Sequence, residues 1–147
     1  MTEVAFHFNA PDKLAYACRL LRKAVASGAR VVVLAPEPEL AQLDGLLWTF
    51  AALEFVPHCH AHSAPDLLAH SPVVLAPEAH ANLPHHDVLV NLGQTWPDGF
   101  EAFARVIEVV SLDDTDRQLA RQRWKRYTEL GYTLVKHDLN LRETAAG

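Results

Sequence analysis

Arg30-Val31-Val32-Val33-Leu34-Ala35 is the stretch that decides the fold. It is an almost unbroken apolar run with the length of one strand, and such a run is typical of a strand buried on both faces of a parallel sheet. Two further runs of the same kind lie at residues 72–77 and 87–92. The three runs predict the centre of an α/β sheet that is covered on both faces.

Helical segments separate the strands. A helix begins at residues 9–12 and runs to about Ser27, and a second helix spans residues 36–49. Outer strands are expected at 4–8, 55–56, 106–110 and 132–136, with a short helix at 100–104. This alternation predicts an open, mostly parallel sheet flanked by helices, with right-handed crossovers. We expect one domain over residues 1–138 and a frayed tail over residues 139–147.

The composition of the chain constrains its number of domains, its compartment and its binding partners. Its 147 residues are enough for one domain that buries a core without disulfides. We expect no membrane span and no secretory leader, and Cys18 and Cys59 suit a reducing cytoplasm. The net charge of -5 disfavours broad, direct binding to duplex DNA, which needs a basic face.

The loop after the first strand, residues 9–13, contains no glycine. A dinucleotide-binding loop needs glycines so that its backbone can approach the pyrophosphate, and a P-loop needs Gly-Lys-Ser or Gly-Lys-Thr, which the sequence lacks. We therefore expect a Rossmann-like topology without a nucleotide site and without a cofactor. The Gly-x-Ser-x-Gly turn of hydrolases is also absent, and no catalytic residue is assigned.

A histidine-rich segment offers a different interpretation. His58, His60 and His62 alternate, so they would share one face of an extended chain. A zinc site needs three or four ligands that are held in place by their neighbours, and the Ala, Ser and Pro residues around these histidines favour a loop instead. We assign no metal site, and a metal-dependent enzyme that uses these histidines stays an alternative.

A basic helix is expected between Asp113 and Gly131. It holds five of the thirteen Lys and Arg residues, so the formal net charge of the rest of the chain is near -10 (-5 minus 5). Arg117, Arg121 and Trp124 fall on one stripe of this helix. Two guanidinium groups beside an indole suit a carboxylate and a stacked aromatic ring, although a solvated helix face is the alternative. Arg123 lies on the apolar stripe, where it must snorkel, pair with a carboxylate or meet a partner.

The chain resembles the chi subunits of bacterial DNA polymerase III nearly end to end. Matching blocks are residues 46–48, 55–58 and 87–92 and, above all, Gln118-Leu119-Ala120-Arg121-Gln122-Arg123-Trp124-Lys125-Arg126-Tyr127 followed by Gly131-Tyr132. The resemblance implies a fold similar to nucleotide-binding domains, without the nucleotide and without catalysis. It implies two partners: the psi subunit, which ties chi to the clamp loader, and the acidic C-terminal tail of single-stranded DNA-binding protein (SSB). That tail ends in a Phe with a free carboxylate, preceded by aspartates.

The resemblance also implies two sites. The site for the SSB tail would comprise Trp48, Val110, Arg117, Arg121, Trp124 and Lys125. The two arginines would bind the terminal carboxylate and nearby acids, Lys125 the acidic stretch, and the other three residues would form the walls of the Phe pocket. Trp48 as a core residue of its helix is the alternative. The psi contact is expected around Phe55, Val56 and Pro57.

These expectations describe a non-catalytic adaptor that links the clamp loader to SSB-coated DNA. The adaptor would touch DNA only indirectly, through SSB. Direct binding of single-stranded DNA by the Arg/Trp helix is an alternative, since bases stack on a Trp beside an Arg.

Overall fold

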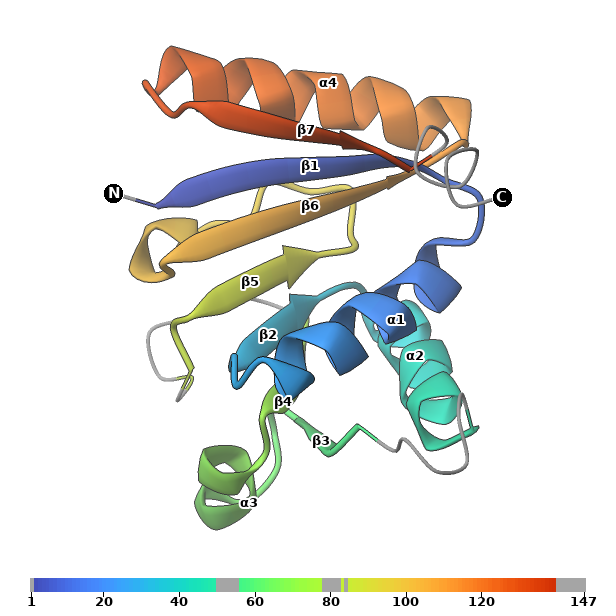
Figure 1. Ribbon diagram of the computed structural model, residues 1–147, viewed down its shortest axis with the longest axis vertical. Helices are drawn as coiled ribbons and strands as arrows, with labels where there is room; N and C mark the ends of the chain where they lie inside the picture. Colours follow the sequence, from blue (N-terminus) through green and yellow to red (C-terminus); the bar gives the residue numbers. More distant parts are fainter. Residues whose placement is uncertain (1, 50–55, 78–82, 84, 140–147) are drawn as a thin grey trace.

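The computed structural model describes residues 2–49, 56–77, 83 and 85–139, and these form an open seven-stranded sheet (Figure 1). The strands are β1 (Glu3–Ala10), β2 (Val31–Leu34), β3 (His58–His60), β4 (Val73–Ala76), β5 (Val88–Asn91), β6 (Arg105–Ser111) and β7 (Leu134–Asp138). They lie in the order β3-β4-β2-β5-β6-β1-β7, and each neighbouring pair is parallel. The prediction of an open, mostly parallel α/β sheet is confirmed.

Helices cover the two faces of the sheet in separate groups. α1 (Lys13–Ala26) and α2 (Glu37–Thr49) pack on one face, where Leu21, Leu40 and Leu47 belong to the same core cluster as Val31 and Val33. The opposite face carries α4 (Asp114–Glu129), α3 (Pro65–His70) and a 3-10 helix at Phe100–Ala102. Since the residues of β2 point alternately to the two faces, the whole strand must be apolar.

The strand order explains this division. The crossovers through α1 and α2 both move along the sheet toward β3, whereas the crossovers through α3 and α4 move toward β7. Right-handed connections that run in opposite directions place their helices on opposite faces. α4 therefore lies across the sheet from α1 and α2 (Figure 1).

Two expectations about the secondary structure are wrong. The histidine-rich segment contains strand β3 and helix α3 rather than a loop. The strand has no apolar sequence pattern because β3 is an edge strand in which only Cys59 is buried. β7 begins at Leu134, because Tyr132 packs against Phe100 and Tyr127. Leu139, the first residue of the expected tail, is buried in the core beside α1 and α2.

Other expectations fall partly outside the described residues. Phe55 and residues 140–147 lie outside the described residues. Val56, which was expected in a strand with Phe55, is buried but is not part of a strand. Both cysteines are free and buried. Within the described ranges, no helix combines the length and the apolarity that crossing a bilayer requires.

Candidate functional site

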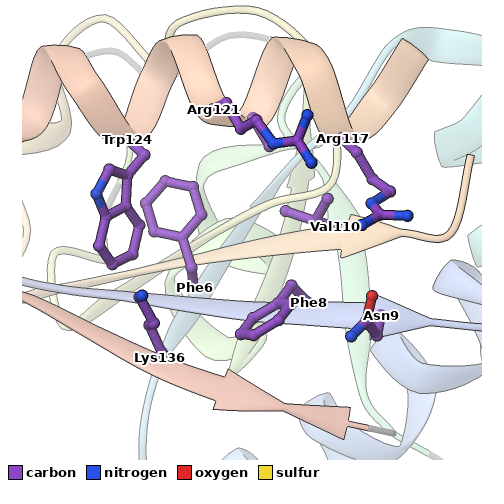
Figure 2. A pocket seen from close by; sticks show the side chains of 9 residues that line it. Phe6, Phe8, Asn9, Val110, Arg117, Arg121, Trp124 and Lys136 are labelled. Carbon is purple, nitrogen blue, oxygen red and sulfur yellow. The ribbon is translucent and has the colours of Figure 1, made fainter. Parts of the chain in front are cut away.

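A cavity of about 310 Å³ lies between α4 and strands β1, β6 and β7 (Figure 2). We call it the α4 pocket, and it is lined by Phe6, Phe8, Asn9, Val110, Arg117, Ala120, Arg121, Trp124 and Lys136. Aromatic and aliphatic side chains make up most of this lining. Its cations come from two elements, with two arginines on α4 and a lysine on β7. An apolar cavity with a few convergent polar groups is typical of a ligand site.

Helical spacing brings the α4 residues together. Arg117, Arg121 and Trp124 are four and three residues apart, so they lie on one face as predicted. In Figure 2 both guanidinium groups point toward the cavity. Among the described residues, neither arginine has a carboxylate within ion-pairing distance. Both are therefore available to an incoming anion.

The aromatic rings of the α4 pocket support one another. The ring of Phe6 meets the indole of Trp124 edge-on, with 5.0 Å between centroids, and it meets Tyr127 in the same way at 5.9 Å. Edge-to-face contacts of this kind stabilise a fixed ring orientation. Trp124 is thus held partly buried, with the Lys136 ammonium 5.2 Å from its ring centre.

A buried carboxylate fastens α4 to the sheet. Glu108 on β6 is fully buried and accepts hydrogen bonds from Arg123 Nε at 3.1 Å, Tyr127 Oη at 2.9 Å and Asn91 Nδ2 at 3.0 Å. Burial raises the pKa of Glu108, while these three partners act against that rise. Burial and the Glu108 carboxylate also raise the pKa of Tyr127. The sequence left three possibilities for Arg123: snorkelling, pairing with a carboxylate or contact with a partner. The structure shows that it pairs with the carboxylate of Glu108.

A second ion pair fixes the start of α4. Asp113 caps the helix by accepting a hydrogen bond from the Asp116 backbone N–H at 3.1 Å. The buried Asp116 carboxylate pairs with Lys13 Nζ at 2.8 Å and accepts two hydrogen bonds from Ser111. Lys13 also donates to the Leu92 carbonyl at 2.9 Å. The pair lies at the carboxyl ends of β1, β5 and β6, the edge where related folds bind nucleotides.

We expect that replacing Asp116 with Asn lowers the free energy of unfolding by about 1.5 kcal/mol. This is the lower limit for a charge-assisted hydrogen bond, since the amide oxygen still accepts from Ser111. Burial alone raises the pKa of Asp116, but Lys13 and Ser111 outweigh it and hold the pKa below the ordinary value of 3.8. The stability that the carboxylate adds is therefore present above about pH 4 and is lost as the pH falls through the folded-state pKa. Urea unfolding at several pH values measures the difference, and a gap that widens in acid would contradict this assignment.

The structure brings together four of the six residues assigned to the SSB tail. Val110, Arg117, Arg121 and Trp124 line the α4 pocket. Lys125 is exposed on α4 but does not contribute to the lining. Trp48 does not line this pocket, because α2 covers the opposite face of the sheet. Trp48 is 62% exposed, so it is not a core residue either, and its ring meets His58 edge-on at 5.8 Å.

Sequence reasoning missed five lining residues: Phe6, Phe8, Asn9, Ala120 and Lys136. The alternation of Phe6 and Phe8 along β1 was a usable signal, because such residues share one face of a strand. Lys136 is found only through the strand pairing, which sets it opposite Phe6.

The histidines of β3 have protein partners. His58 Nε2 lies 2.7 Å from Asp44 Oδ1, and His58 Nδ1 lies 2.7 Å from the Val56 carbonyl oxygen. His60 Nε2 is 3.6 Å from the same Asp44 oxygen, and His62 stacks on His60. In the part of the chain that the structure describes, no group of three or more His, Cys, Asp or Glu side chains could hold a metal ion.

Fold and site together define an α/β protein with a Rossmann-like parallel sheet and a cationic, apolar pocket on its last long helix. The model of the family "DNA polymerase III chi subunit, HolC" matches residues 1–135. The DNA polymerase III subunit chi of Pseudomonas aeruginosa is 37% identical over 145 residues, 95% of this chain and 98% of that protein. Those of Escherichia coli K12 and Haemophilus influenzae are 32% and 31% identical, each over 80% of this chain and over 79% and 81% of their own lengths.

The chain belongs to the family of DNA polymerase III chi subunits. It is therefore a replication accessory subunit, as its resemblance to the family implied.

Proposed function

We propose that this protein is a non-catalytic adaptor that binds the acidic C-terminal tail of SSB in the α4 pocket and, through psi, links it to the clamp loader. The observation that carries the proposal is an apolar pocket floor beside the guanidinium groups of Arg117 and Arg121, which form no ion pair with any described residue. A terminal Phe needs an apolar cavity, and its carboxylate needs a fork of donors. Both are present within one pocket.

The psi contact belongs, in this proposal, to the face opposite the α4 pocket. Val56 is buried and lines a second, larger groove beside α1, and Pro57 next to it is exposed. The exposed Trp48 lies near this segment through its contact with His58. An exposed Trp is a frequent anchor of protein interfaces. Phe55, the third residue assigned to psi, lies outside the described residues.

Two sites on opposite faces suit a linker. One protein can hold psi and an SSB tail at the same time, and the many tails on coated DNA raise the effective concentration of the ligand. In this scheme the protein touches DNA only through SSB and acts in the cytoplasm, where its free thiols stay reduced.

Sedimentation velocity of the protein mixed with the SSB of the same organism tests the proposal. We expect a complex with full-length SSB that dissociates as salt is added, since the charges of the α4 pocket are exposed and are screened. SSB that lacks its C-terminal residues serves as the control and should not bind. Equal binding to both forms of SSB, or retention on bare oligonucleotide, would favour direct contact with DNA or with the SSB core.

Replacing Trp48 with Ala should leave the affinity for an SSB-tail peptide unchanged and weaken binding to psi by about 2 kcal/mol, the scale of an interface hot spot. The reason is the position of α2, which the sheet separates from the α4 pocket. Calorimetric titration with each partner measures both effects. A loss of tail affinity with intact psi binding would reverse this assignment.

A further inference from the structure

Lys136 is a cation of the α4 pocket that faces the arginines from the other side. It lies on the edge strand β7, directly opposite Phe6 of β1 in the strand pairing. Neighbouring residues in register point to the same face of a sheet, so Lys136 shares the face that α4 covers. Figure 2 shows its amino group raised from β7 toward Trp124.

The surroundings of Lys136 leave its charge available. Among the described residues, no carboxylate lies within ion-pairing distance of Lys136 Nζ. The Lys136 ammonium lies over the ring of Trp124, 5.2 Å from its centroid. A cation over an indole face is stabilised without being neutralised. The side chain is exposed, and a ligand reaches it without a rearrangement of the protein.

Figure 2 separates the pocket into two ends. The guanidinium groups of Arg117 and Arg121 lie near Val110 and Asn9, whereas the Lys136 ammonium lies near Trp124 and Phe6. A carboxylate that is bound by Arg117 and Arg121 therefore lies at the other end of the pocket from Lys136. A ligand that fills the pocket needs a second negative charge to meet this lysine.

We propose that Lys136 is a specificity-determining residue that binds an acidic side chain upstream of the C-terminal residue of the peptide, while Arg117 and Arg121 bind the terminal carboxylate. This inference rests on the proposed function and adds a division of labour between the two walls of the α4 pocket. The ligand is an acidic peptide, clamped between α4 and β7 by charges on both sides.

Two simpler roles of Lys136 make different predictions. A lysine on an edge strand can serve only to prevent edge-to-edge pairing of sheets. It can also contribute only to the general positive field around the pocket. The first role predicts no effect of Lys136 on peptide affinity. The second predicts the same effect from removing any exposed cation.

A double-mutant cycle separates these roles. The probe is a fluorescent peptide in which aspartates precede a C-terminal Pro-Phe, and its partner probe has the aspartates replaced by asparagine. Both are titrated against the full-length wild-type protein, Lys136→Met, Lys136→Arg and Lys23→Met. Lys23 is an exposed cation on α1, across the sheet from the pocket, and is the charge-matched control.

We expect Lys136→Met to weaken binding of the aspartate peptide about two- to fivefold, the effect of losing one exposed ion pair. Lys136→Arg and Lys23→Met should bind like the wild type, and Lys136→Met should not weaken binding of the asparagine peptide further. Unchanged affinity of Lys136→Met, an equal loss with both peptides, or an equal loss in Lys23→Met overturns the inference and leaves tail binding intact. A wild-type protein that does not bind the aspartate peptide overturns the proposed function as well.

Discussion

Replacing Glu108 with Gln is expected to lower the free energy of unfolding by about 3–5 kcal/mol, the cost of breaking a buried ion pair from one side. The substitution leaves the guanidinium of Arg123 buried, at 4% exposure, without its carboxylate. It also weakens the hydrogen bond that Tyr127 Oη donates to Glu108. Both partners lie on α4, so the loss falls on the contact that holds this helix against the sheet.

Chemical denaturation of the variant and the wild type measures this effect. The double variant Glu108→Gln, Arg123→Met should recover much of the loss, because no buried charge is then left unpaired. Glu101→Gln provides a control, since Glu101 is exposed on the 3-10 helix and its change should stay within about 0.5 kcal/mol. If the single variant loses less than about 1 kcal/mol, Glu108 does not anchor α4.

Replacing Arg121 with Ala is expected to weaken binding of the SSB tail by about 1.5–3 kcal/mol, the scale of a charge-assisted hydrogen bond. The guanidinium lines the α4 pocket between Trp124 and Arg117, where a terminal carboxylate can accept two parallel bonds. Calorimetric titration with the acidic peptide measures the change. The fold should be unaffected, since Arg121 is exposed.

Two further variants give this prediction its control. Arg121→Lys keeps the charge but loses the planar fork, so its affinity should lie between those of wild type and Arg121→Ala. Lys23→Ala removes a cation from α1, away from the pocket, and should bind like the wild type. Equal affinity of Arg121→Ala and wild type would remove this arginine from the site.

The sheet and its main helices could be predicted because their signals are local. The apolar run at residues 31–34 has the length and the β-branched composition of a doubly buried strand, and the acidic start of α4 and the glycine after it mark the helix ends. β3 could not be predicted in this way. An edge strand needs only one buried residue, and in β3 this residue is Cys59, between two polar histidines.

The candidate site could be predicted in part. The stripe of Arg117, Arg121 and Trp124 follows from helical geometry alone, whereas the other side of the pocket depends on which strands lie beneath α4. Lys136 enters through a pairing between β1 and β7, which are far apart in the sequence. Trp48 was assigned to the pocket through the family resemblance, and the sequence of α2 could not test this, because its periodicity does not say which face of the sheet the helix covers. The direction of each crossover decides that.

We expect the α4 pocket to receive a C-terminal carboxylate together with the aromatic side chain of the same residue. Fluorescence anisotropy of a labelled acidic peptide ending in Pro-Phe tests it most directly, with the same peptide amidated at its C-terminus as the comparison. We predict saturable binding of the free acid and a large loss of affinity for the amide. Equal binding of both peptides, or no binding of either, would contradict the claim and assign the basic helix to a different ligand.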